Sequence, residues 1–440
     1  MKPNKRVLVV LSWPTLYPGG IENYIYSFVK KCRSEDSKNV DIMISTKAYY
    51  CSGAYSDMLN DDNVKFCEYN MYEDHIVSQF EAKEIDRAIL ITFTVCDFSL
   101  AESMRAKHKK LCIDTFYFVP NYRGVHVCID EPYPHLRKKN IQKKLSKVFE
   151  KMSKKNSIRY FSNRGLEAME KNYSYKEAND DIMVPSVAPQ YIFDEENARN
   201  LYRREYFNVF TISRFDFPHK GYVIGLIKAY GKLKEKYPQI RLTIVGYGAG
   251  LDRVKETIAS LSEEAQKDVY LCGQCAPTEL DGYYRDANIN VSLAGCFTQG
   301  AKRGTLSIPT RHYCYDCETY GFLPKSKDYA VSELPGKPVE PFIEQVINMS
   351  EDEYVAYCKA SYDAYNSTES KSIEDILESL RNKTDDCLTE KEVNYILRIR
   401  KKATKYLYLR QGIRVIKENG LKFFIFNTIP KHLKKASNGQ

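Results

Sequence analysis

The chain has 440 residues, of which 43% are hydrophobic and 28% charged, and its formal net charge is +9 at pH 7. This length is too great for one ordinary hydrophobic core and predicts two domains. No run approaches the ~18 consecutive apolar residues that a membrane-spanning helix needs. The apolar run 7–11 is too short for a signal peptide. It predicts a first buried strand, and hence a cytoplasmic protein.

Positive charge is concentrated in two segments. Residues 137–159 hold ten Lys or Arg and one acid, and residues 398–440 hold twelve and one acid. The balances are +9 and +11, which leaves −11 for the rest of the chain. An acidic body with two basic segments is not typical of a nucleic-acid binder. It indicates a protein that touches an anionic surface in two places.

The first half of the chain alternates short apolar strands with amphipathic helices. Strands are predicted at residues 6–12, 40–45, 88–95, 111–119 and 159–162. Apolar residues at helical spacing predict helices over 21–32 and 137–155. The polar stretch 184–204 is predicted to be an irregular junction between two domains.

The second half repeats the alternation. Strands are predicted at 208–213, 241–245, 269–271 and 289–293, with helices between them at 223–237, 251–261 and 277–287. Such alternation predicts an α/β fold with parallel, doubly wound sheets. We therefore expect two Rossmann-like domains facing a cleft, over residues 1–190 and 205–382, and a basic helical tail over 383–440.

Two strand-to-turn units in the second half have the features of a phosphate site. The strand at 208–213 leads to Arg214 and Lys220, and the next strand ends in a turn with Gly246 and Gly248. Ligands of α/β proteins bind outside the carboxyl ends of strands, where cations and a helix N-terminus favour a diphosphate. Each residue alone is more often a solvated charge or a simple turn, but together they predict a nucleotide diphosphate site.

These motifs resemble those of GT-B glycosyltransferases, in particular glycosyltransferase family 4, which are retaining enzymes that use nucleotide-sugar donors. The matching residues are Pro18-Gly19-Gly20-Ile21-Glu22, Ser213-Arg214-Phe215, His219-Lys220-Gly221 and Ile244-Val245-Gly246-Tyr247-Gly248. The resemblance implies that Arg214 and Lys220 hold the donor diphosphate and that the Gly19-Gly20 turn closes over the sugar phosphate. Fixed cations and N–H groups can neutralise the leaving group, so no metal or other cofactor is expected.

The segment after the strand at 289–293 departs from the family pattern. Relatives carry two glutamates eight positions apart that bind the sugar and the ribose, where this chain has Gly295 and Arg303. Gln299 and Gly300 stay candidates for the sugar, and Arg303 for a phosphate or a donor carboxylate. Glu318 resembles an acid of the relatives and is a candidate for the ribose contact.

Two further sets of residues leave alternatives open. Retaining relatives often use a histidine near the sugar, and the candidates here are His126 and His135. The pairs Cys272/Cys275 and Cys314/Cys317 have the spacing of a zinc ribbon. The alternative for all four cysteines is that they are small buried thiols.

The predicted partners are a nucleotide sugar and a glycan or lipid-linked acceptor, without nucleic acid. Segments 137–159 and 398–440 could dock on an anionic membrane, or their helices could simply pack on the body of the protein. The main hypothesis is a glycosyltransferase of surface-polysaccharide biosynthesis. The alternative, which the missing acid pair favours, is a non-catalytic relative that binds or chaperones another transferase.

Overall fold

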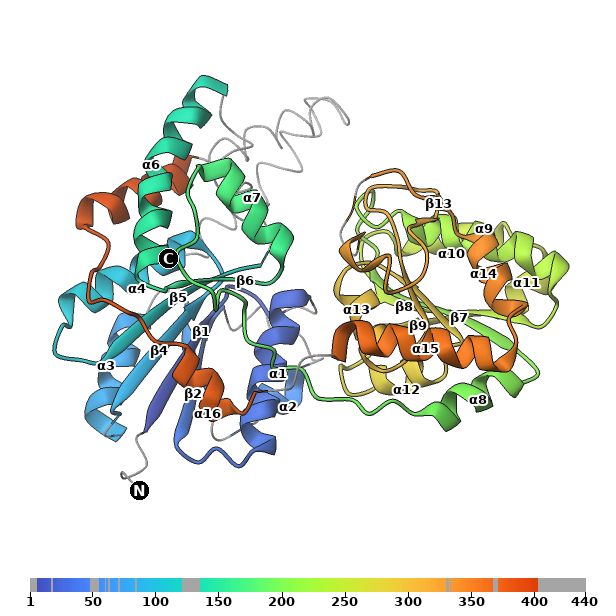
Figure 1. Ribbon diagram of the computed structural model, residues 1–440, viewed down its shortest axis with the longest axis horizontal. Coiled ribbons are helices and arrows are strands. Elements are labelled where there is room, and N and C mark those ends of the chain that lie inside the picture. Colours follow the sequence, from blue (N-terminus) through green and yellow to red (C-terminus); the bar gives the residue numbers. More distant parts are fainter. Residues whose placement is uncertain are drawn as a thin grey trace, which may run out of the picture. The chain divides into compact units, whose positions relative to one another are not determined.

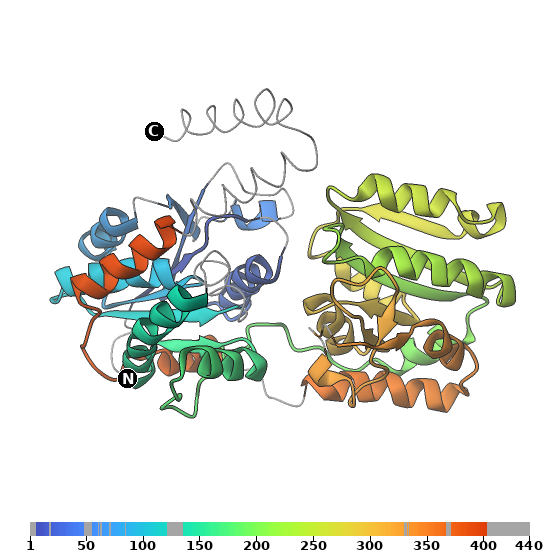
Figure 2. The ribbon, with the colours of Figure 1, turned by 90° about the horizontal axis from the view of Figure 1, so that it is seen from above.

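A computed structural model describes residues 6–402, except 17–18, 48–54, 60, 62–63, 70–71, 84, 121–134, 330–331, 333 and 367–370. The chain divides into two compact units. The first comprises residues 1–52, 57–187 and 371–440, and the second comprises residues 53–56 and 188–370. Each unit contains a parallel sheet with helices packed on its two faces (Figures 1 and 2).

The first unit is built on a six-stranded parallel sheet in the order β3-β2-β1-β4-β5-β6. Its strands are β1 (Val7–Ser12), β2 (Val40–Thr46), β3 (Val64–Glu68), β4 (Arg87–Thr92), β5 (Ile113–Val119) and β6 (Ile158–Tyr160). Strands β4 and β5 are buried throughout, because they lie inside the sheet and helices cover both faces. The strand order reverses between β1 and β4, which makes this the topological switch point of the first unit.

The helices of the first unit include the two that the sequence predicts, α1 and α6, whose apolar stripes are largely buried. The unit contains α1 (Gly20–Ser34), α2 (Ser56–Leu59), α3 (Tyr72–Lys83), α4 (Val95–Lys107), α6 (His135–Lys154), α7 (Asn163–Tyr173) and α16 (Ile373–Ser379). The stripe of α6, which includes Leu145 and Phe149, packs in one core with Val393 and Ile396 of a helix over residues 390–402. No helix in the described part of the chain is long and apolar enough to cross a membrane.

The second unit is built on a five-stranded parallel sheet in the order β11-β10-β7-β8-β9. Its strands are β7 (Phe207–Arg214), β8 (Ile240–Tyr247), β9 (Val269–Gly273), β10 (Ile289–Ser292) and β11 (Ser307–Pro309), with a small hairpin of β12 (Glu318–Thr319) and β13 (Lys337–Pro338). Its main helices are α8 (Glu195–Arg203), α9 (Tyr222–Lys236), α10 (Leu251–Ala259), α11 (Glu263–Lys267), α12 (Leu280–Arg285), α13 (Gly295–Lys302), α14 (Glu340–Ile347) and α15 (Glu351–Asn366). The strand order reverses between β7 and β10.

The prediction of an irregular junction over 184–204 is wrong for the second half of this segment, where α8 forms. Asp194 caps this helix by accepting a hydrogen bond from the backbone N–H of Asn197 at 2.9 Å. Only Ala198 and Leu201 are buried, so the sequence of this segment shows too few apolar residues for a helical stripe. Ion pairs of Arg199 with acids of α15 hold the helix on the second unit.

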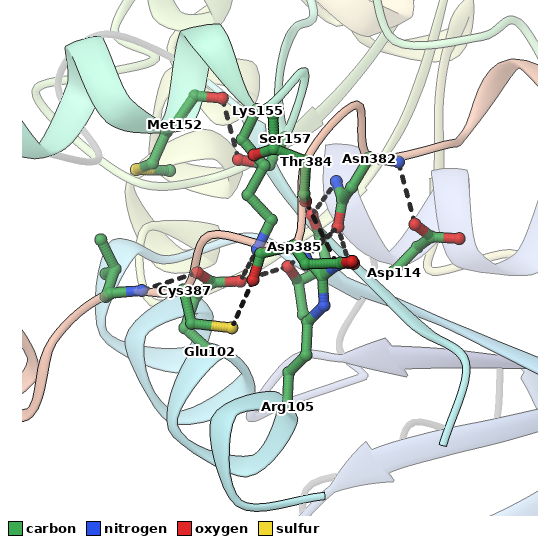
Figure 3. Close-up of polar contacts among 12 residues, drawn as sticks. Glu102, Arg105, Asp114, Met152, Lys155, Ser157, Asn382, Thr384, Asp385 and Cys387 are labelled. Atoms are coloured by element: carbon green, nitrogen blue, oxygen red, sulfur yellow. Dashed lines mark hydrogen bonds and ion pairs between the residues drawn. The ribbon is translucent and has the colours of Figure 1, made fainter. Parts of the chain in front are cut away.

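The chain returns to the first unit at residue 371, rather than leaving the second unit at 382 as predicted. Buried side chains fasten the returning segment (Figure 3). Asn382 accepts a hydrogen bond from Thr115 N–H at 2.9 Å and one from Arg105 at 2.9 Å, and Leu388 N–H donates to Glu102 at 3.0 Å. The segment 371–402 is therefore an integral part of the first unit, and the separate tail predicted from residue 383 is corrected in its described part.

Candidate functional site

Two cations lie where β7 ends, at the switch point of the second sheet. Arg214 is the last residue of β7, and Lys220 directly precedes Gly221 and α9. The Arg214 side chain is 44% exposed and lies 3.4 Å from Asp216, which is a loose ion pair. Arg214 is therefore held near the strand end while its guanidinium stays accessible to a ligand.

Lys220 is half-buried and forms no ion pair with any described residue. Burial lowers the pKa of its ammonium, and the nearby positive charge of Arg214 acts in the same direction against the opposing charge of Asp216. Burying a cation without a carboxylate partner costs folding free energy. An arrangement that keeps two cations close at this cost is typical of a site that binds an anion.

A cysteine that the sequence analysis missed lies beside these cations. Cys296 is in the first turn of α13, which follows β10 across the switch point. Burial raises the pKa of the Cys296 thiol, while the charges of Lys220 and Arg214 act in the opposite direction. The first turn of α13 thus shares the site with both cations. Its backbone N–H groups are suited to an anion, since the N-cap residue Ala294 makes no side-chain cap.

Glycines bring the loops at this sheet edge into close contact. A Cβ on Gly246 would clash with the carbonyl oxygen of Ser213 in the neighbouring strand, and Gly248 has a φ of +133°, which disfavours other residues. A Cβ on Gly221 would lie 2.7 Å from the carbonyl oxygen of Cys314. The predicted residues Gly246 and Gly248 therefore set the spacing of the loops around Arg214.

Gly225, in the interior of α9, is a further residue that the sequence analysis did not single out. A Cβ there would clash with the backbone N of Cys317 and lie 2.5 Å from the carbonyl oxygen of Tyr315. The loop after β11 is thereby packed on α9, next to the cations. A glycine inside a helical pattern is a signal of such a close approach of backbones.

Arg303 and Gln299 were predicted to bind the donor, and the structure records other contacts for them. The Arg303 guanidinium pairs with Asp281 at 2.5 Å and lies 4.2 Å from the ring centre of Tyr191. Gln299 Oε1 accepts a hydrogen bond from Arg303 at 2.7 Å. Both residues lie toward the C-terminal end of α13. Their contacts with Asp281, Tyr191 and each other do not support a role in donor binding, which stays a prediction.

Two other predicted residues have structural contacts as well. Gly300 packs α13 on β10, since a Cβ there would clash with the Asn290 side chain. Glu318 Oε2 accepts hydrogen bonds from Arg311 at 2.9 Å and from Gly336 N–H at 2.8 Å. Burial tends to raise the pKa of Glu318, but these donors outweigh it and lower the pKa. Glu318 thus fastens the β12–β13 hairpin as a carboxylate.

The remaining predicted residues lie in the first unit. Gly19 is the N-cap of α1, where a Cβ would lie 2.5 Å from Glu22 Oε2, whereas Gly20 has open space around it. His135 begins α6, and His126 lies outside the described residues.

The four cysteines of the two zinc-ribbon-like pairs are free. They are Cys272, Cys275, Cys314 and Cys317. The described residues include no group of three or more His, Cys, Asp or Glu side chains that could hold a metal ion.

Two Rossmann-like units, each with a parallel sheet, define the GT-B fold, and this chain has the fold of the GT-B glycosyltransferases. Within it, residues 193–295 match the model of the family described as glycosyl transferases group 1. This match covers β7, β8, β9, β10 and the beginning of α13, and so includes Arg214 and Lys220. No curated protein matches the chain in sequence.

Three solved structures illustrate the likeness of fold. Trehalose-6-phosphate synthase OtsA is 12% identical, with 86% of this chain and 97% of that chain covered and a TM-score of 0.50. Anabaena HepE in complex with UDP and glucose is 11% identical, with 84% and 97% covered and a TM-score of 0.50. A mutant of S. aureus TarM in complex with fondaparinux, α-GlcNAc-glycerol and UDP is 9% identical, with 85% and 98% covered and a TM-score of 0.50.

Proposed function

We propose that this protein is a glycosyltransferase that moves a sugar from a nucleotide-diphosphate donor to a glycan or lipid-linked acceptor of a surface polysaccharide. The observation that carries the proposal is Lys220, a half-buried ammonium that has no ion-pair partner among the described residues, beside Arg214 at the switch point of the second sheet. A bound diphosphate would supply the negative counter-charge for these two cations. The family match over residues 193–295 and the UDP in the HepE complex support the same assignment.

We further propose that the transfer retains the configuration of the sugar, as in the family that the motifs resemble. The bond between the anomeric carbon and the diphosphate oxygen breaks, and its electron pair leaves with the diphosphate. The acceptor hydroxyl forms the new bond on the same face and gives its proton to the leaving phosphate. Arg214, Lys220 and the first turn of α13 would stabilise the charge that develops on the leaving group. Proton NMR of the product's anomeric signal tests retention.

Nucleotides are expected to stabilise the second unit against heat. Saturating ligand raises the free energy of unfolding by ~2.7 kcal/mol at a hundredfold excess over Kd. A thermal-shift screen with UDP, GDP and their sugars should therefore raise the melting temperature for at least one base. CMP and CMP-sugars carry a single phosphate and serve as the control. Equal behaviour of all nucleotides and buffer would contradict the proposal.

A non-catalytic relative that binds a partner transferase is the second candidate. It is favoured by the two positions of the missing acid pair, since Gly295 has no side chain and Arg303 is engaged by Asp281 and Gln299. The two candidates differ in turnover and not in nucleotide binding. Release of UDP or GDP from a bound nucleotide sugar, in the presence of acceptor, identifies the enzyme; stable binding without release identifies the partner protein.

The first unit carries an exposed basic face, which we define as Lys139, Lys143, Lys144 and Lys147 of α6 with Arg398, Lys401 and Lys402 of the helix over 390–402. These two helices are adjacent, since Lys144 lies 4.9 Å from the ring centre of Tyr395. Their apolar stripes are buried together, so these parts of the two helices can meet a membrane only through their charges. We propose that this face docks on anionic lipid headgroups, which would bring the enzyme to a lipid-linked acceptor.

Binding to vesicles is expected to depend strongly on salt. Each cation near an anionic bilayer contributes about 1 kcal/mol, and salt screens this attraction. Replacing Lys143 and Lys147 with glutamine should therefore weaken sedimentation with phosphatidylglycerol vesicles by about tenfold or more. Replacing the exposed Lys228 and Lys255 of the second unit is the matched control. Sedimentation that is unaffected by salt and by the first pair of changes would contradict the proposal.

A further inference from the structure

The switch point of the first sheet also has the features of a binding site. Trp13 directly follows β1, and Phe93 directly follows β4, so the two residues flank the place where the strand order reverses. In open α/β sheets, ligands bind in the crevice at the carboxyl ends of the strands at this point. The proposed diphosphate site occupies the equivalent place in the second sheet, and no role has yet been given to the aromatic residues at this one.

Trp13 is held rigidly and stays partly exposed. Its Nε1–H donates a hydrogen bond to Glu22 Oε1 at 3.0 Å, and its ring meets Phe93 edge-on with the ring centres 6.1 Å apart. The half-buried Phe161 stacks on Phe93, and Tyr24 packs edge-on against both phenylalanines. An aromatic surface fixed in this way loses little conformational entropy when a ring-shaped ligand stacks on it.

Hydroxyl groups without partners lie next to this aromatic surface. Tyr24 Oη and Thr46 Oγ1 are buried and have no hydrogen-bond partner within the described part of the chain. The backbone of Thr46 lies beside that of Trp13. The backbone N–H of Trp13 donates a hydrogen bond at 3.0 Å to the carbonyl oxygen of Ser45, the residue that precedes Thr46. Buried polar groups in native proteins are normally satisfied by protein, water or ligand, so these two hydroxyls indicate a polar ligand or the water that bridges to it.

A carboxylate lies in the first turn of each of the two helices that follow β1 and β4 at this switch point. Glu22 is in the first turn of α1, and Asp97 is in the first turn of α4. Each carboxylate offsets the positive end of its helix, and Arg400 is the cation that approaches Asp97, at 3.8 Å. The first unit thus differs from the second, where the described residues place one carboxylate, that of Asp216, loosely beside two cations.

We propose that Trp13 is the stacking platform for a neutral pyranose ring of the acceptor, with the ring's apolar face on the indole and its hydroxyls toward Tyr24 and Thr46, directly or through water. This assignment rests on the proposed glycosyl transfer and gives it an acceptor of stated chemistry. A sugar ring has one face of C–H groups and an edge of hydroxyls, which matches an aromatic plane flanked by unpaired hydroxyls. Trp13 is the one tryptophan of the chain, so its fluorescence reports on this place alone.

The experiment is a fluorescence titration of the full-length protein with methyl glycosides of glucose, galactose, mannose, rhamnose and N-acetylglucosamine. At least one neutral glycoside should change the Trp13 emission in a saturable way, and inorganic phosphate should not. Tyr24→Phe and Thr46→Val should each weaken the affinity for that glycoside by about 2- to 10-fold, the value of one hydrogen bond, without lowering the melting temperature. Removal of a purely structural hydroxyl would instead lower the melting temperature and leave the affinity for the glycoside unchanged.

Three outcomes separate this inference from the proposed function. If no glycoside changes the emission although UDP or GDP raises the melting temperature, the acceptor platform is overturned and the glycosyltransferase assignment stands. Failure of both measurements overturns both. Trp13 must also be quenched by acrylamide, and a Trp13 that acrylamide cannot reach would overturn the platform by itself.

Discussion

Replacing Lys155 with methionine is expected to destabilise the first unit by about 3–5 kcal/mol, because it leaves a buried carboxylate without its counter-charge. Lys155 and Glu102 are both 2% exposed at their side chains, and Lys155 Nζ lies 2.5 Å from Glu102 Oε1 (Figure 3). Burial lowers the pKa of Lys155, and the charge of Glu102 opposes this shift. Glu102 also accepts hydrogen bonds from Thr115 and from Leu388 N–H, so it ties the returning segment to the sheet.

The measurement is calorimetric unfolding with the transitions of the two units resolved. The transition of the first unit should move to lower temperature and that of the second should not. The double variant Glu102→Gln/Lys155→Met should recover most of the loss, because the amide oxygen can accept the bond from Leu388 N–H, the amide NH2 can donate to the Thr115 hydroxyl, and no charge is left unpaired. The exposed Lys147→Met on α6 is the control, expected within about 0.5 kcal/mol of the wild type. If the Lys155→Met change left the stability of the first unit unaltered, the buried ion pair would not stabilise that unit.

The parts of the fold that follow from local pattern could be predicted. Strands β7 and β8 were placed within about two residues, because continuous apolar and β-branched runs between turn residues are typical of buried parallel strands. Strand β3 was missed, since at the edge of the sheet it has only two buried residues, Val64 and Cys67, in five positions. Helix α8 was missed for a related reason, as its stability comes from a cap and from ion pairs that a hydrophobic pattern does not record.

Contacts between distant parts of the sequence were the main source of error. Nothing near Asn382 shows that its side chain pairs with Thr115, so the return of the chain to the first unit could not be predicted from its own segment. Arg303 is similar, because its partners Asp281 and Tyr191 precede it by many residues and only the structure brings them together. A charged residue at a motif position therefore indicates a site only when its partners are known.

The candidate diphosphate site was found because its two cations are close in sequence. Arg214 and Lys220 are six positions apart, on one loop at a strand end, so local pattern and tertiary position coincide. The glycines of the same motif were recognised as a turn at the end of a strand, and the structure shows what their missing side chains allow. Gly246 allows the ends of β7 and β8 to approach closely, and the unpredicted Gly225 does the same for α9 and the loop after β11.

Replacing Lys220 with methionine is expected to weaken the binding of UDP or GDP by about 10- to 100-fold, because a charge-assisted hydrogen bond to phosphate contributes ~1.5–3 kcal/mol. The same change is expected to raise the stability of the free protein. In the absence of ligand, the Lys220 ammonium is partly desolvated and no described residue forms an ion pair with it, and a methionine of similar length avoids that cost. Isothermal titration with UDP and GDP, and thermal unfolding of the free protein, measure the two effects. Lys228→Met, an exposed change on the same α9, is the control and should alter neither.

The pH dependence of both quantities follows from the lowered pKa of Lys220. Below this pKa the folded and unfolded states both hold the proton, so Lys220 adds no pH dependence to stability. Between the lowered pKa and the ordinary value of 10.5, the unfolded state binds more protons, and stability therefore rises with pH. Over the same window the folded protein loses the charge that attracts the diphosphate, and nucleotide affinity falls. The Lys220→Met variant should lack both trends. A ligand-binding Lys220 therefore predicts changes of opposite sign: the Lys220→Met variant gains stability and loses nucleotide affinity. Removal of a purely structural lysine would instead lower the stability and leave the nucleotide affinity unchanged.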